Sequence, residues 1–182
     1  MQFFSKYLSN IAESVNNVDA RLLRQLADIF RSTREVGRKV VLVGNGGSAA
    51  IAAHVALDLT KAANVRAISF SEAALLTCFA NDYGYEHWVE KALEFYADPG
   101  DAAVLISSSG RSTNIVDGAK LASARKLRVV TLSGFDADNP LRRLGELNLW
   151  VNSRSYNVVE MTHHVWLVAA VDRLVAEEAD RT

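Results

Sequence analysis

The chain has 182 residues, of which 49% are hydrophobic and 23% charged, with a formal net charge of −1. This length suits one domain with a sizeable core, and the balanced charge argues against nucleic acid or an anionic membrane as a partner. One cysteine, Cys78, excludes a disulfide within the chain and favours a reducing, cytoplasmic compartment. No apolar run reaches the roughly 18 residues that span a bilayer, and the N-terminus lacks the pattern of a signal peptide.

The periodicity of the apolar residues predicts helices alternating with strands. The expected helices cover about 2–17, 19–36, 49–63, 72–79, 86–97, 113–125, 141–144 and 156–178, and the expected strands cover 40–43, 65–70, 102–106, 128–132 and 147–151. Residues 81–85 are expected to form a turn. This alternation predicts an α/β fold, with a five-stranded parallel sheet flanked by helices in a flavodoxin-like three-layer sandwich.

We expect a single domain over residues 1–182, with a helical N-terminal region at about 2–36 and an α/β core at about 38–178. Each of the first two helices carries an apolar stripe, which needs a partner surface. That surface could be the sheet of the same chain or another subunit.

A glycine-rich turn, Gly-Asn-Gly-Gly-Ser at residues 44–48, follows the first predicted strand and leads into a helix. At the N-terminus of a helix, backbone N–H groups and the helix dipole can bind an anion. Asn45 and Ser48 would supply side chains there, and Gly46 and Gly47 would let a ligand approach the backbone closely. By itself such a sequence could equally be only a tight turn.

A second polar loop, Ser-Ser-Ser-Gly-Arg-Ser-Thr-Asn at residues 107–114, follows the third predicted strand. Its hydroxyl groups, from Ser107, Ser108, Ser109 and Ser112, suit a phosphate monoester at the start of a helix. The serines could also be loop residues and helix caps, but the recurrence of strand, serine and helix favours phosphate binding. The dinucleotide motif Gly-x-Gly-x-x-Gly and the P-loop motif are both absent from the sequence.

Three segments together resemble the sugar isomerase (SIS) domain family, and within it the phosphoheptose isomerase branch. They are residues 44–48, residues 81–84 (Asn-Asp-Tyr-Gly) and residues 106–112 (Ile-Ser-Ser-Ser-Gly-Arg-Ser), and the resemblance runs from about residue 5 to 178. It implies an aldose–ketose isomerase that converts sedoheptulose 7-phosphate to D-glycero-D-manno-heptose 7-phosphate. It also implies a homo-oligomer, usually a tetramer, with sites between subunits and often with zinc.

The resemblance also assigns roles to individual residues. Asn45 and Asp82 would contact the sugar, and the two N-terminal helices would pack in the oligomer. The phosphate would be held by the serines, namely Ser48, Ser107, Ser108, Ser109 and Ser112.

Isomerisation moves a proton between adjacent carbons, which requires a base and an acid. His54 and Asp58 are four residues apart on one predicted helix and therefore share a face, as do Glu160 and either His163 or His164 on the last helix. If these pairs converge, His54, Asp58, Glu160 and His163 have the ligand types of a zinc site. The histidines could instead be partly buried residues without a ligand.

The last helix departs from the family pattern. Asp58 stands where the family has its catalytic glutamate, and we expect it to be the base with His164 as the acid. The family's catalytic histidine, eight residues after a glutamine, falls on Val168 if Glu160 is placed under that glutamine, or on Leu167 after a shift of one residue. Neither can transfer a proton. The sequence therefore leaves two hypotheses: a phosphoheptose-type isomerase, or a non-catalytic phosphosugar-binding SIS protein that acts through oligomerisation and protein partners.

Overall fold

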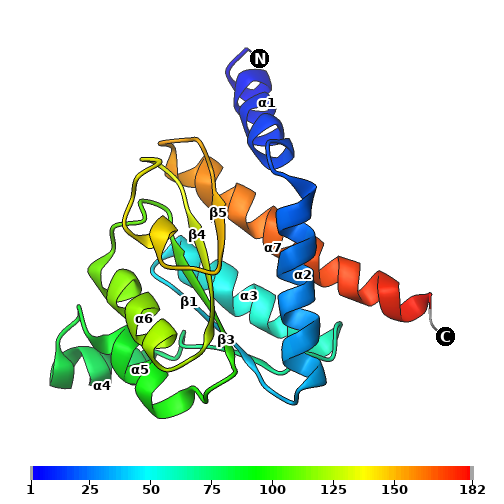
Figure 1. Cartoon of the computed structure of the whole chain (residues 1–182). Helices are drawn as coiled ribbons and strands as arrows, with labels where there is room; N and C mark the ends of the chain where they lie inside the picture. Colours follow the sequence, from blue (N-terminus) through cyan, green and yellow to red (C-terminus); the bar gives the residue numbers. More distant parts are fainter. Residues whose placement is uncertain (1, 181–182) are drawn as a thin grey trace.

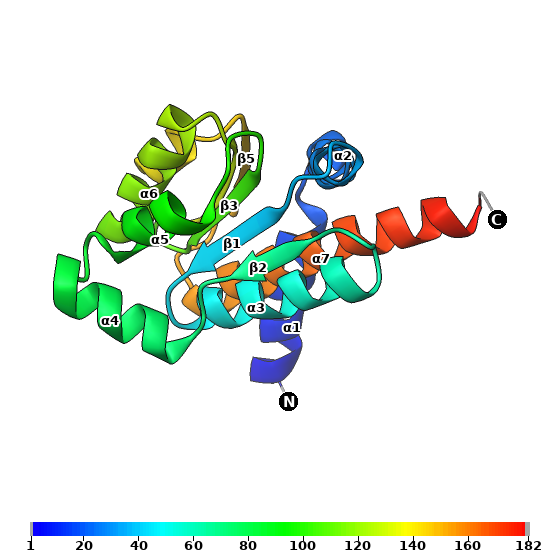
Figure 2. The same cartoon turned by 90° about the horizontal axis from the view of Figure 1, so that it is seen from below.

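The computed structural model describes residues 2–180 and contains one parallel sheet with strand order β2-β1-β3-β4-β5 (Figures 1 and 2). The strands are β1 (Val40–Gly44), β2 (Ala67–Ser69), β3 (Ala102–Ser107), β4 (Arg128–Ser133) and β5 (Leu147–Trp150). This is the flavodoxin-like order, in which strand order reverses between β1 and β3. The five-stranded parallel sheet predicted from the sequence is confirmed.

Helices cover both faces of the sheet. They are α1 (Gln2–Asn16), α2 (Ala20–Glu35), α3 (Gly47–Lys61), α4 (Ala73–Tyr83), α5 (Trp88–Tyr96), α6 (Thr113–Ala124), the short 3-10 helix η1 (Leu141–Arg143) and α7 (Tyr156–Ala179). Val40 and Leu42 of β1 pack against α2, α3 and α7, whereas Val41 and Val43 face α5 and α6. Because both faces are buried, the strand is continuously apolar rather than alternating.

The first two helices differ in what covers their apolar stripes. Helix α2 buries Leu26 and Phe30 completely in the core beneath the sheet. Helix α1 extends away from the body of the domain (Figure 1) and has no buried residue, with Phe3, Phe4 and Leu8 exposed by 71%, 68% and 63%. The apolar stripe of α2 is therefore covered by the core of the same chain. The packing against another subunit that was expected for both helices stays a prediction for α1.

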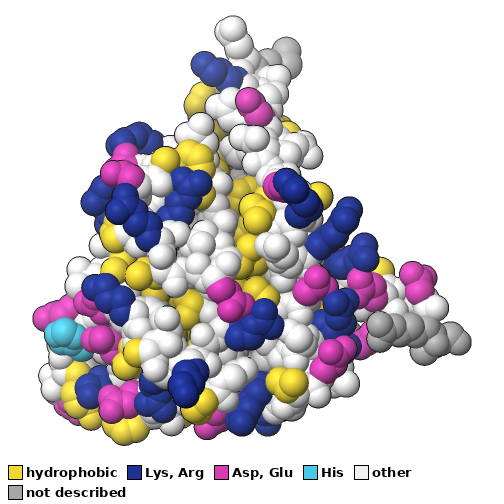
Figure 3. Space-filling view, viewed as in Figure 1, with side chains coloured by type: hydrophobic (Ala, Val, Ile, Leu, Met, Phe, Trp, Pro, Cys, Tyr) yellow, Lys and Arg dark blue, Asp and Glu magenta, His cyan; other side chains and the backbone are white. Residues whose placement is uncertain are grey.

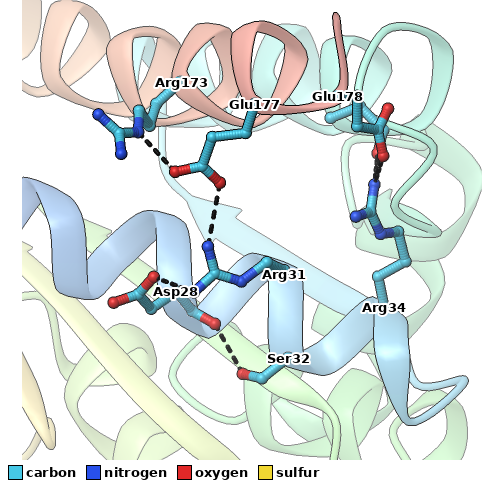
Figure 4. Close-up of polar contacts among 8 residues, drawn as sticks. Asp28, Arg31, Ser32, Arg34, Arg173, Glu177 and Glu178 are labelled. Carbon is cyan, nitrogen blue, oxygen red and sulfur yellow. Dashed lines mark hydrogen bonds and ion pairs between the residues drawn. The ribbon is translucent and has the colours of Figure 1, made fainter. Parts of the chain in front are cut away.

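Ion pairs join α2 to the C-terminal part of α7 (Figure 4). Glu177 accepts hydrogen bonds from Arg31 at 3.0 Å and from Arg173 at 2.6 Å, and Arg34 pairs with Glu178. Such solvent-accessible pairs each contribute only about 0–1 kcal/mol. Together with the packing of buried Leu174, these ion pairs hold the C-terminal part of α7 against α2. Glu160, His163 and His164 lie closer to the start of the same helix.

The structure differs from the sequence-based expectation at residues 81–85, where a turn was predicted. Helix α4 instead continues to Tyr83 and ends at Gly84, which has φ of 90°. Glycine adopts this left-handed conformation without steric cost, so it terminates the helix where Asn81 and Asp82 alone do not. Asp82 therefore lies on a helix rather than in a loop.

Charged side chains of both signs are interspersed over the face shown in Figure 3, in keeping with the net charge of −1. Within residues 2–180, no helix combines the length and the apolar character needed to cross a membrane.

Candidate active site

The two polar loops meet at the carboxyl ends of neighbouring strands. Gly44, the last residue of β1 and the first of the glycine turn, lies beside Ile106 of β3, and the serine loop begins directly after Ile106. The two loops line a cavity of about 120 Å³ together with the start of α7. Its lining residues are Asn45, Ser48, Ile106, Ser107, Ser108, Ser109, Ser112, Tyr156 and Glu160. Ligands of open α/β sheets bind in this position, at the reversal of strand order.

Two glycines shape the turn beneath this cavity. Gly46 has φ of 56° and precedes the first residue of α3, so a residue with a side chain would be strained there. At Gly47, a Cβ atom would overlap the carboxylate of Glu160. The sequence Gly-Gly at this point therefore serves both the backbone turn and the close approach of a group from α7.

The serine hydroxyls are not used as helix caps. Ser112 occupies the N-cap position of α6, but its side chain makes no capping hydrogen bond and accepts one from Ser107 Oγ at 3.1 Å. Ser48 lies in the first turn of α3 and is 3% exposed, whereas the cap residue there is Gly46. Ser108 Oγ lies 3.5 Å from Glu160 Oε1. The geometry thus brings the predicted phosphate-binding serines together, and their binding of phosphate stays a prediction.

Asn45 is held by two residues that the sequence reasoning missed. Its Oδ1 accepts hydrogen bonds from Asn114 Nδ2 and from the Tyr85 hydroxyl, both at 3.1 Å, and its Nδ2 donates to Asn114 Oδ1 at 3.0 Å. Asn114 is the last residue of the serine loop, so its place near the site could be expected from the sequence, but its pairing with Asn45 depends on the sheet. The network fixes the orientation of the Asn45 amide at the edge of the cavity.

Asp82, expected to contact the sugar, lies outside the lining of the serine cavity. On α4 its carboxylate accepts hydrogen bonds from Asn81 Nδ2 at 2.9 Å and from the Cys78 thiol at 3.5 Å. The hydrogen bond to Asp82 raises the pKa of the Cys78 thiol, which keeps the thiol protonated at neutral pH. Cys78 is therefore not suited to act as a nucleophile.

A second group of polar side chains connects α3 with α7. His54 Nδ1 lies 2.7 Å from His164 Nε2, and His54 Nε2 lies 3.1 Å from Asp58 Oδ2. Asp58 as a carboxylate can only accept, so His54 Nε2 carries a proton; in a neutral His54, Nδ1 then accepts from His164 Nε2–H. The structure therefore brings the predicted base and acid into one hydrogen-bonded chain, with His54 between them.

The surroundings favour a neutral His164. Partial burial lowers the pKa of His164 and the neighbouring His54 lowers it further, while Asp58 acts in the opposite direction. A neutral imidazole has one donor and one acceptor nitrogen, so it can give and take a proton in turn.

His163 is not part of this group. Its ring is completely buried, and Nε2 donates a hydrogen bond to the Ser133 carbonyl at 3.0 Å. Nδ1 is buried without a hydrogen-bond partner among the residues described. Burial lowers the pKa of His163 to about 4. The His163 ring points into the core, whereas the next residue on α7, His164, faces α3.

The four residues predicted as zinc ligands are therefore not assembled in this chain. His163 faces the core, Glu160 lines the serine cavity, and both nitrogens of His54 are engaged by His164 and Asp58. Across residues 2–180, no group of three or more histidine, cysteine, aspartate or glutamate side chains is arranged to hold a metal ion. As placed here, this donor set does not fit zinc.

The buried histidine predicts a pH-dependent stability. In the unfolded chain His163 titrates near its ordinary pKa of 6.5, whereas the folded chain keeps it neutral down to about 4. The unfolded state thus binds more protons between these values, so the contribution of this residue is fully present above pH 6.5 and decreases by about 3 kcal/mol as the pH falls to 4. The variant His163→Gln keeps an N–H donor but does not titrate. In denaturant unfolding at several pH values, its free energy of unfolding should therefore fall less steeply with decreasing pH than that of the wild type. The same dependence on pH in both proteins would contradict this assignment.

Comparison with known proteins gives a consistent family assignment. Residues 3–134 match the family model described as SIS domain. The phosphoheptose isomerase of Akkermansia muciniphila is 34% identical over 166 residues, which cover 87% of this chain and 84% of that relative. That of Cytophaga hutchinsonii is 35% identical over 137 residues, covering 72% and 71%.

Structural similarity extends over nearly the whole chain. The structure of phosphoheptose isomerase GmhA from Neisseria gonorrhoeae matches with a TM-score of 0.86 and 27% sequence identity, covering 95% of this chain and 96% of that one. The resemblance found in the two polar loops is thereby confirmed. The chain belongs to the SIS domain family, and the three relatives named above are phosphoheptose isomerases.

Proposed function

We propose that this protein is a sugar-phosphate aldose–ketose isomerase that converts sedoheptulose 7-phosphate to D-glycero-D-manno-heptose 7-phosphate. One observation carries the proposal: the same two helices supply both halves of the site. Helix α3 begins at the serine cavity with Ser48 and carries His54 and Asp58 further on; helix α7 brings Glu160 to the cavity and His164 to His54. The relatives named above act as phosphoheptose isomerases, which supports this class of substrate.

The spacing along α3 suits a long sugar phosphate. His54 lies six positions after Ser48, and at 1.5 Å per residue this corresponds to about 9 Å along the helix. An extended seven-carbon chain has a comparable length. With the phosphate among the serines, C1 and C2 of the open-chain sugar would therefore lie near His54 and the two groups it contacts.

In this arrangement a carboxylate oxygen of Asp58 takes the proton from C1 of the ketose. The C1–H electron pair forms the C1–C2 double bond. The carbonyl oxygen at C2 takes the Nε2 proton of His164, which in the free protein is donated to His54 Nδ1, and this gives an enediol. His164 then takes the proton from the hydroxyl at C1 while the acid form of Asp58 returns a proton to C2. In the free protein His54 contacts both Asp58 Oδ2 and His164 Nε2, which places the base and the acid beside each other.

A second function is favoured by the last helix. Leu167 and Val168, the positions that correspond to the family's catalytic histidine, pack in the core: Leu167 is completely buried and Val168 lies against the same cluster. A chain that binds the phosphosugar without converting it, and acts through oligomerisation and partners, would have this feature. Retention of the linked Asp58, His54 and His164 favours the isomerase.

The direct test incubates the purified protein with sedoheptulose 7-phosphate and follows formation of the aldose. Turnover supports the isomerase. Binding in calorimetry without turnover would favour the non-catalytic function, and absence of both would overturn the assignment of the serine cavity.

The serine loop makes a separate prediction about affinity. Removal of two hydroxyls in Ser109→Ala/Ser112→Ala should weaken sugar-phosphate binding by roughly thirtyfold to a thousandfold, since each hydrogen bond to a charged group contributes about 1–2 kcal/mol. Calorimetric Kd values would measure the change. Ser123→Ala, an exposed serine further along α6, is the matched control, and equal affinity in all three proteins would contradict the role of the loop.

A further inference from the structure

The cavity at the serine loop contains a side chain that carries the same sign of charge as its expected ligand. The Glu160 carboxylate packs against the backbone of Gly47, the residue at which a Cβ atom would overlap it. Its Oε1 also lies 3.5 Å from Ser108 Oγ. The carboxylate thus contacts both the glycine turn at the start of α3 and the serine loop, the two elements expected to hold a phosphate.

No cation offsets this carboxylate within the cavity. Among the described residues that line it, Glu160 is the one with a charged side chain. The nearest basic residue of the loop, Arg111, directs its guanidinium to Asp136 at 3.5 Å, and Asp136 also pairs with Arg154. A phosphate entering the cavity therefore meets a like charge unless Glu160 moves away.

We propose that Glu160 occupies the phosphate site of the free protein as an internal anion and determines which phosphates bind. This inference rests on the proposed function, because it assumes that the serine cavity holds the phosphate of a sugar. A ligand must displace the carboxylate from Gly47 and Ser108 before its phosphate can take that place. A sugar phosphate gains contacts beyond the cavity that offset this displacement, whereas inorganic phosphate has none and is rejected.

The test compares inorganic phosphate with sedoheptulose 7-phosphate by calorimetry in three proteins: the wild type, Glu160→Gln and Asp172→Asn. Glu160→Gln keeps the shape of the side chain and removes its charge. Asp172→Asn removes one charge from an exposed position on the same helix and is the control. We expect inorganic phosphate to bind Glu160→Gln at least ten times more tightly than the wild type, and Asp172→Asn to leave its affinity unchanged.

Each other outcome overturns the inference in a distinguishable way. If the wild type binds sedoheptulose 7-phosphate but Glu160→Gln binds inorganic phosphate no more tightly than the wild type does, Glu160 does not exclude phosphate from the cavity. The proposed function then stands. If Asp172→Asn tightens binding equally, the effect is one of net charge alone. If no protein binds either compound, the phosphate site itself is wrong and both proposals fall together.

Discussion

Replacement of Asp58 with asparagine is expected to lower kcat for isomerisation at least a hundredfold. A positioned general base contributes roughly 10²–10⁴ to a rate, and the amide that replaces the carboxylate cannot take a proton from carbon. The amide is nearly the same size as the carboxylate, so binding of the phosphate at the far end of α3 should persist and KM should change little.

Steady-state kinetics on Asp58→Asn and on the exposed control Asp172→Asn would measure this effect. The side chain of Asp58 is 34% exposed, so its substitution should leave the fold intact, and thermal unfolding would verify this. If Asp58→Asn turned over at the rate of a wild type shown to isomerise, the base would have to be sought elsewhere.

Replacement of Gly110 with alanine should destabilise the fold by about 3 kcal/mol and deform the serine loop. Gly110 has φ of 65°, and its new Cβ would overlap the side chain of Asn139. Asn139 is completely buried and donates hydrogen bonds to Ser133 Oγ at 3.1 Å and to the Asp136 carbonyl at 2.8 Å. The cost combines about 1–2 kcal/mol for a left-handed backbone with about 1–3 kcal/mol for overpacking.

Gly37→Ala provides the matched control for this prediction. Gly37 has φ of 70°, but a Cβ atom there would meet nothing within 4 Å. The cost of the left-handed backbone is therefore the same as at Gly110, and Gly37→Ala should lower the free energy of unfolding by only about 1–2 kcal/mol. In denaturant unfolding, the difference in destabilisation between the two variants measures the effect of the overlap with Asn139. Equal destabilisation would show that this contact does not constrain the loop.

Much of the fold was predictable because its signals are local. Val40 to Val43 form an unbroken apolar run that ends in a glycine turn, which indicates a strand buried on both faces. Each polar loop was expected directly after a strand, where open α/β sheets bind ligands. That the two loops are adjacent follows from the strand order, which places β1 beside β3. The turn predicted at residues 81–85 was wrong, since Gly84 rather than Asn81 ends α4.

The finer parts of the site depended on contacts between distant elements. On α7, both His163 and His164 share a face with Glu160 at helical spacing, so the sequence could not decide between them. Packing decides it: one ring lies over the Ser133 carbonyl and the other reaches His54. The placement of Glu160 against Gly47 likewise depends on how α7 crosses the start of α3.

The measurement that tests the central claim most directly is an NMR experiment on sedoheptulose 7-phosphate and the wild-type protein in D₂O. Proton transfer through Asp58 and an enediol predicts conversion to the aldose, with deuterium from the solvent at C2 in part of the product. Binding of sedoheptulose 7-phosphate without any conversion would contradict the isomerase and leave a phosphosugar-binding protein. Conversion with the original hydrogen fully retained would contradict the role given to Asp58.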